Sequence, residues 1–245
     1  MLTNYFKDFE KNIIKKSLKS SKSAYEKSAT RKTGVQKNAS TQIDTDKIKG
    51  SLSRIIPGKF AIDAVRPISA SGFSPEGADL IIYFDYCKDI LELFNGAVPQ
   101  ELVHGTISII QNLDKKGLSE VLNRVAGVKK INFFASNEET SQPAIPAFII
   151  TGESSIPLPE LKNDMINYYM SNNIDFSHEV DVLMVLNKGL LIKNWREKRS
   201  FIALETGKDT MMWFYILLNE YLDIEKSRAL DMRKYIKNET IYPEY

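Results

Sequence analysis

The stretch "VHGTISIIQNLDKKGLSEVL", residues 103–122, decides the fold. Its first half is an apolar run with no charged side chain between His104 and Asp114, which is typical of a strand in the middle of a sheet. Its second half places Leu118, Val121 and Leu122 at helical spacing on one face. The sequence therefore predicts a buried strand followed by a helix that crosses back over the sheet.

Segments of strand and helix character surround this stretch. Apolar runs predict strands in "KFAIDAVRPI", "GADLIIYFDY", "AFIITG" and "SFIALE", and a β-hairpin in "EVDVLMVLNKGLLIKN" that turns at residues 187–189. Helical spacing predicts helices over 41–56, 157–173 and 207–224, whereas 89–101 is interpreted as an extended edge and loop. The predicted fold class is α/β, with a mixed central β-sheet flanked by helices.

The composition indicates a globular protein. The 245 residues, 43% of them hydrophobic, suffice for one large domain with an appendage. No run reaches the roughly 18 apolar residues of a membrane span, and the charged start lacks the apolar segment of a signal peptide, so we expect a cytoplasmic protein with no membrane partner. The single cysteine, Cys87, excludes an intramolecular disulfide, and we expect His104 and His178 to be structural or surface residues.

The N-terminal part differs from the rest in charge. Residues 1–60 contain fourteen Lys and Arg against five Asp and Glu, a net charge of +9, while the remainder carries −7. The spacing predicts an amphipathic helix from residue 2 and a basic linker at 30–41, which gives three parts: 1–41, an α/β domain at 42–223 and a polar tail at 224–245.

The basic segment has two interpretations. Its candidate phosphate contacts are Lys15, Lys16, Lys19, Lys22, Arg31 and Lys32, while the alternative is an ordinary solvated helix face. The apolar stripe of the same helix could also mediate homo-oligomerisation.

The order of the elements and a series of short motifs resemble the PD-(D/E)XK nuclease superfamily. The stretches "RIIPGKF", "SASGFSPEGADLIIYFD" and "VPQELVHGTISII", then "LDKKGLSEVLNRVAGVKK" and "GKDTMMWFYILLNEYL", are similar to a group of uncharacterised bacterial nuclease-like domains. The resemblance covers residues 42–223 and implies a restriction-endonuclease-like core with an N-terminal helical extension. It also implies a metal-dependent site, in which an Asp and a Glu on neighbouring strands bind the metal and a Lys stabilises negative charge.

The resemblance places some of these groups and leaves others missing. By this resemblance, Asp79 corresponds to the metal-binding Asp, and Asp44 or Asp46 lies near the position of an N-terminal helix Glu that can complete the metal site in the family. The Glu position falls on Ser108 and the Lys position on Ile110. The pair that would complete the metal site is therefore absent.

Three hypotheses follow. The first is a degenerate, catalytically inactive nuclease fold that binds a protein or nucleic acid in bacterial conflict, as an immunity or antitoxin-type inhibitor or a phage-defence component, with no cofactor. The second is a Mg²⁺- or Mn²⁺-dependent endonuclease with a rearranged site, in which Glu101 supplies the second carboxylate, Lys116 or Lys115 the cation, and Asp79 with Asp46 the metal ligands. The third is an oligomeric assembly protein.

Overall fold

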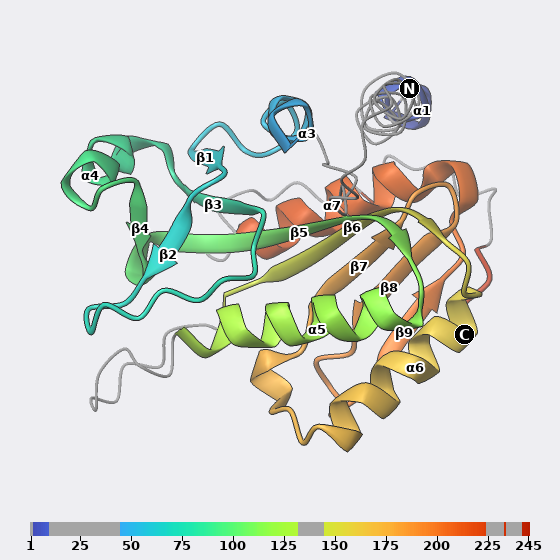
Figure 1. Cartoon of the computed structure of the whole chain (residues 1–245). Helices are drawn as coiled ribbons and strands as arrows, with labels where there is room; N and C mark the ends of the chain where they lie inside the picture. The colour runs from blue at the N-terminus through green and yellow to red at the C-terminus, as the bar shows by residue number, and fades with distance from the viewer. Residues whose placement is uncertain (1, 10–44, 132–144, 224–232, 234–241) are drawn as a thin grey trace, which may run out of the picture.

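The computed structural model describes residues 2–9, 45–131, 145–223, 233 and 242–245. Its centre is a seven-stranded mixed sheet in the order β1-β3-β5-β6-β7-β8-β9, as predicted (Figure 1). These strands are β1 (Phe60–Asp63), β3 (Leu80–Phe84), β5 (Val103–Leu113), β6 (Ala147–Ser154), β7 (Val182–Val185), β8 (Gly189–Lys193) and β9 (Phe201–Leu204).

The sheet is parallel only in its middle. β1, β3 and β5 pair antiparallel, β5, β6 and β7 pair parallel, and β7, β8 and β9 are antiparallel again. The parallel step from β5 to β6 requires a crossover, and α5 (Lys115–Lys129) follows β5 directly. Asp114 caps this helix by accepting a hydrogen bond from the backbone N–H of Gly117.

Helices cover both faces of the sheet (Figure 1). One face packs against α1 (Leu2–Phe9), α3 (Thr45–Leu52) and α7 (Thr210–Leu222). The other face packs against α5 and α6 (Leu158–Ser171). Because both faces are covered, the central strands are buried almost throughout, which explains their continuous apolar runs.

The first helix packs onto the body of the protein itself. Phe6 and Phe9 are buried, and the ring of Phe6 lies 4.8 Å from that of Tyr215 in α7. Phe6 and Phe9 are thus buried within the chain, whereas Tyr5 on the same helix is 55% exposed. The other residues of the predicted long helix, the predicted phosphate contacts Lys15, Lys16, Lys19, Lys22, Arg31 and Lys32, and Asp44 lie outside the described residues.

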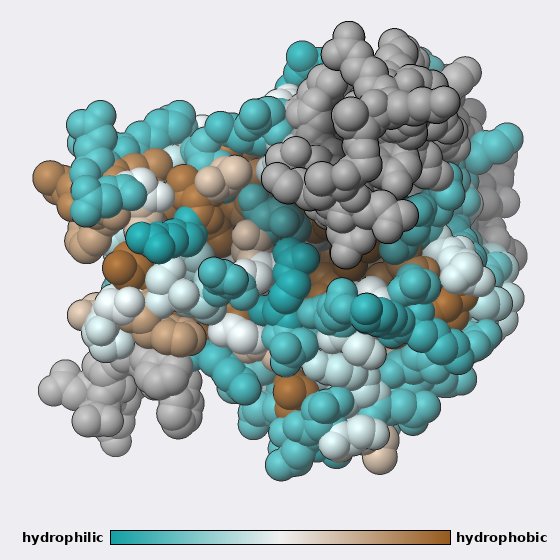
Figure 2. All heavy atoms as spheres, in the orientation of Figure 1, coloured by the Kyte–Doolittle hydropathy of each residue, from teal (hydrophilic) through white to brown (hydrophobic). Residues whose placement is uncertain are grey.

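A small lobe at the β1 end of the sheet differs from the prediction. The extended edge expected at 89–101 instead contains α4 (Lys88–Leu93), and β2 (Arg66–Ile68) pairs parallel with β4 (Ala97–Pro99). Four large apolar side chains of this lobe are exposed, namely Phe73, Tyr86, Leu93 and Phe94. Figure 2 shows apolar atoms gathered over the lobe. Exposed patches of this kind often mark surfaces that bind a partner.

Four short 3₁₀ helices complete the elements named in the described part of the chain. They are η2 (Asp85–Cys87), η3 (Gln100–Leu102), η5 (Phe176–His178) and η6 (Gly207–Asp209). Among the described helices, none is long and apolar enough to cross a membrane.

The hairpin between β7 and β8 has a glycine that the packing requires. A Cβ at Gly189 would overlap the carbonyl oxygen of Leu204 and approach Leu158 Cδ1 to 2.6 Å. We expect Gly189→Ala to lower the free energy of unfolding by about 3 kcal/mol, measured by urea denaturation. Gly50→Ala in α3, where a Cβ meets nothing within 4 Å, should instead raise it by about 0.5–1 kcal/mol. Equal effects of the two substitutions would contradict this packing.

Candidate functional site

Asp79 lies just before β3 and faces the middle of β5. Its backbone N–H donates a hydrogen bond to the carbonyl oxygen of Ile107 at 2.9 Å. Its carboxylate oxygen Oδ2 accepts a hydrogen bond from the backbone N–H of Ile109 at 2.6 Å. The side chain is about one third exposed, at 32%. The carboxylate therefore fastens the entry of β3 to the neighbouring strand.

The same carboxylate oxygen also binds a cation of the protein. Arg124 of α5 places Nη2 3.1 Å from Asp79 Oδ2 and donates from Nη2 and Nε to the carbonyl oxygen of Gly77, at 3.1 and 3.3 Å. Ser108 Oγ donates to that carbonyl at 3.0 Å. Asp79, Arg124, Gly77 and Ser108 thus form one polar cluster, which we call the Asp79 cluster.

The register places Ser108 directly opposite Asp79. Leu80 pairs with Ile107 across the antiparallel strands, so the next pair outward is Asp79 with Ser108, on the same face. Ser108 is buried, and Ile110, two residues further along that face, packs against the core beneath α5 and α6. Where the resemblance required a carboxylate and a lysine, the strand has a hydroxyl bound to a carbonyl and an apolar side chain.

The structure does not bring the proposed substitutes to Asp79. Glu101 lies in η3 before β5, and the strand start at Val103 is about 17 Å from Ser108. Lys116 in the first turn of α5 is 87% exposed and lies 3.7 Å from Glu120. Lys115 pairs with Glu160 and Asp164 of α6, at 3.2 and 3.6 Å.

The second proposed metal ligand lies on the other face of the sheet. Asp46 is exposed on α3, whose buried side chains Ile48 and Leu52 pack on the face opposite α5. Arg124 reaches Asp79 from α5. The geometry therefore separates Asp46 from the Asp79 cluster.

These residues do not fit a divalent metal. In metal-dependent nucleases, one or two carboxylates bind Mg²⁺ or Mn²⁺ and leave coordination positions open for water and the phosphate. Here the single carboxylate is hydrogen-bonded on Oδ2 and has a guanidinium 3.1 Å away, whose charge repels a cation. Within the described ranges, no group of three His, Cys, Asp or Glu residues is arranged to hold a metal ion.

A second polar cluster, which the sequence did not indicate, lies where α5 ends and β7 begins. Its four charged side chains are buried: Lys129, Glu179, Asp181 and Lys193. Lys129 Nζ donates to Asp181 Oδ2 at 2.6 Å, and Lys193 Nζ lies 3.9 Å from Glu179 Oε2. The Asp181 carboxylate also accepts from the backbone N–H of Ala147 at 2.7 Å. This charge-balanced group ties α5, β6, β7 and β8 together.

Burial shifts the pKa values in this second cluster. Loss of solvation raises the pKa of Glu179 to about 7 and lowers that of Lys193 to about 8. Neither carboxylate oxygen of Glu179 has a hydrogen-bond partner in the described part of the chain, which is consistent with the penalty on its charged form.

The two histidines belong to neither cluster. The ring of His104 lies 5.3 Å from that of Phe60 and 4.0 Å from that of Phe84, and burial lowers its pKa. Burial also lowers the pKa of His178, in η5. Cys87 is buried as a free thiol.

The sheet order, the meander β1-β3-β5 and the crossover α5 define a restriction-endonuclease-like fold. The solved structures that it resembles include NucC of Pseudomonas aeruginosa ATCC27853 in a cAAA-bound form, with a TM-score of 0.66, 12% sequence identity and 96% of each chain covered. The cAAA-bound NucC of Escherichia coli MS115-1 gives a TM-score of 0.66 at 15% identity, again over 96% of each chain. Its apo form gives 0.58 at 16% identity, over 78% of this chain and 88% of that one. No family model and no curated protein matches the sequence.

The Asp79 cluster predicts a structural role for Asp79. We expect Asp79→Ala to lower the free energy of unfolding by about 2 kcal/mol in metal-free buffer, because Ile109 N–H and Arg124 lose their acceptor. Asp85→Ala, which removes an exposed pair with Lys88, should change it by less than about 0.5 kcal/mol. A carboxylate kept for metal binding would behave differently, since its removal commonly leaves stability unchanged or raises it.

The pKa of Glu179 predicts how stability depends on pH. Because its folded-state pKa is raised from 4.5 to about 7, its stabilising contribution is present below about pH 4.5 and is lost as the pH rises towards 7. Between pH 5 and 7, wild type should therefore lose stability relative to Glu179→Gln, by up to about 1.4 kcal/mol per pH unit. Urea denaturation at pH 5, 6 and 7 measures this, with the exposed Glu153→Gln as control. Parallel curves for wild type and Glu179→Gln would contradict it.

Proposed function

We propose that this chain is a catalytically inactive protein of restriction-endonuclease-like fold that acts as a binding module in bacterial conflict or defence, such as an immunity or antitoxin-type inhibitor or a phage-defence component. The observation that carries the proposal is the Asp79 cluster. The one acidic residue retained from the resemblance is bound to Arg124 and to Ile109 N–H. The residue opposite it is Ser108, which can supply no charged ligand.

The chemistry of phosphodiester cleavage supports the inactive state. A metal-dependent nuclease must gather anionic ligands around the metal and supply a cation for the developing charge. Arg124 supplies positive charge at this point of the sheet, but it pairs with the carboxylate on which a metal would depend. In the alternative, a rearranged endonuclease, Glu101 or Lys116 would have to reach Asp79. Glu101 lies before the start of β5, and Lys116 lies in the first turn of α5, beyond its end.

The setting in bacterial conflict rests on the similarity of the fold to NucC over nearly the whole chain. Two of those NucC structures are cAAA-bound forms, so cAAA is one ligand to test on this chain beside protein and nucleic-acid partners. The exposed apolar side chains of the α4 lobe, Tyr86, Leu93 and Phe94 among them, support a protein partner, because they offer apolar area for an interface.

The proposal predicts no metal-dependent activity. We expect isothermal titration with Mn²⁺ to show no binding at millimolar metal, and plasmid DNA and RNA to stay intact with Mg²⁺ or Mn²⁺. Arg124→Ala should give the same result, because freeing Asp79 still leaves Ser108 and Ile110 without metal-binding groups. Cleavage by wild type that disappears in Asp79→Ala would overturn the inactive assignment and favour the endonuclease.

A further inference from the structure

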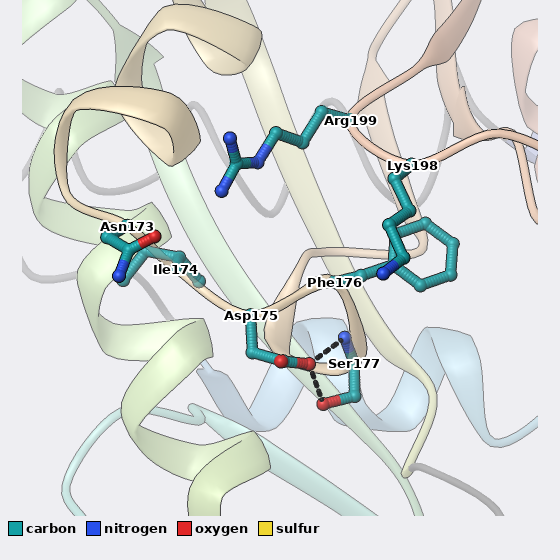
Figure 3. A pocket seen from close by; sticks show the side chains of 7 residues that line it. All are labelled: Asn173, Ile174, Asp175, Phe176, Ser177, Lys198 and Arg199. Carbon is teal, nitrogen blue, oxygen red and sulfur yellow. Dashed lines mark hydrogen bonds between the residues drawn. The ribbon is translucent and has the colours of Figure 1, made fainter.

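A cavity of about 580 Å³ lies between the segment that follows α6 and the loop that joins β8 to β9. The residues around it are Asn173, Ile174, Asp175, Phe176, Ser177, Lys198 and Arg199. Figure 3 shows Lys198 and Arg199 entering from the loop, opposite the 173–177 segment. This volume falls in the usual range for small-molecule sites, and the cavity is separate from the Asp79 cluster.

The charges around the cavity favour an anion. In the described part of the chain, neither Lys198 nor Arg199 forms an ion pair. Asp175, the carboxylate of the lining, is already engaged because its Oδ1 accepts from the backbone N–H and the Oγ of Ser177, at 2.8 and 2.6 Å. These hydrogen bonds lower the pKa of Asp175. The lining therefore carries two cations and one carboxylate, a net charge of +1. Lys198 acts electrostatically on Asp175, and Arg199 acts on Glu179 outside the lining.

The walls of the cavity are held in place from behind. Lys193 Nζ donates to the carbonyl oxygen of Phe176 and lies 3.8 Å from the centre of the Phe176 ring. The same ring makes an edge contact with Trp195 at 5.6 Å. A wall fixed in this way loses little conformational entropy when a ligand binds.

The backbone of the cavity is strained at Arg199. Arg199 has φ 56°, in the left-handed region that an Arg residue rarely adopts. Asn173, with φ 48°, directly follows the end of α6, where Asn commonly adopts this conformation. Strained backbone persists where the surrounding structure determines it, and it often orients a functional side chain. Arg199 is a half-buried residue, and its side chain lines the cavity.

We propose that this cavity binds a small organic phosphate, with Arg199 and Lys198 contacting the phosphate and Phe176 and Ile174 contacting the apolar or flat part of the molecule. Guanidinium and ammonium groups together suit phosphate oxygens, through charge-assisted hydrogen bonds. The volume exceeds what a phosphate ion needs, and the apolar side chains account for the additional space. This inference does not depend on whether the Asp79 cluster is catalytically active.

The test uses adenosine 5′-monophosphate as the probe, because it joins a phosphate to a flat ring. Isothermal titration measures its affinity for the whole chain, and Trp195 fluorescence reports binding beside Phe176. We expect Arg199→Gln and Lys198→Gln to weaken binding by about tenfold each. Arg196→Gln, which removes a charge from the same loop outside the cavity, should stay within about twofold.

Two further probes separate the parts of the ligand. Adenosine should bind at least about tenfold more weakly than the monophosphate, and inorganic phosphate should also bind more weakly. Equal affinity for adenosine would overturn the phosphate contact, and equal affinity for inorganic phosphate would overturn the apolar contact. No binding of the monophosphate to wild type, or equal losses in Arg199→Gln and Arg196→Gln, would overturn the site. Circular dichroism melting of each variant distinguishes lost contacts from lost folding.

Discussion

The structure depends on the burial of β5 on both faces and on its pairing with β3 and β6. Ile107 and Ile109 pack under α3 and α7, while Ile110 and Leu113 pack under α5 and α6. A charge on such a strand would be costly without a paired partner. Packing therefore explains the absence of charge from residues 105–109, which are buried, whereas residues 110–112 are partly or fully exposed and packing does not require their lack of charge.

The Asp79 cluster shows how a single acidic residue persists in this setting. Asp79 binds the backbone of β5 and the guanidinium of Arg124, and Ser108 and Arg124 share the carbonyl oxygen of Gly77. Asp79 Oδ2, Ser108 Oγ and the carbonyl oxygen of Gly77 thereby have partners supplied by the chain itself. The guanidinium of Arg124 places a positive charge 3.1 Å from the Asp79 carboxylate.

Much of the fold could be predicted from the sequence, because hydrophobic periodicity dominates in its central elements. The strand at β5, the crossover α5, the β7–β8 hairpin and the buried α7 all follow from apolar spacing. The prediction of an extended edge and loop at 89–101 was confirmed at β4 but was wrong for residues 89–93, which lie in α4. "KDILEL" is too short for its periodicity to identify a helix against Pro and Gly nearby.

The sites were less predictable than the fold. The absence of Glu and Lys at Ser108 and Ile110 was visible in the sequence, but the partner of Asp79 lies 45 residues away, on α5. One feature of the sequence could have indicated this partner: Arg124 lies at the border of the apolar helix face formed by Val121 and Val125. The cavity at 173–199 joins two loops, and no periodic pattern indicates how loops meet in space.

The central claim is that Arg124, and no metal ion, neutralises Asp79. The most direct measurement is a crystal structure grown in millimolar Mn²⁺, with anomalous diffraction used to locate the metal. The account predicts no anomalous peak at Asp79 and a guanidinium that remains within about 3 Å of its carboxylate. A manganese peak about 2 Å from Asp79, with Arg124 displaced, would contradict it.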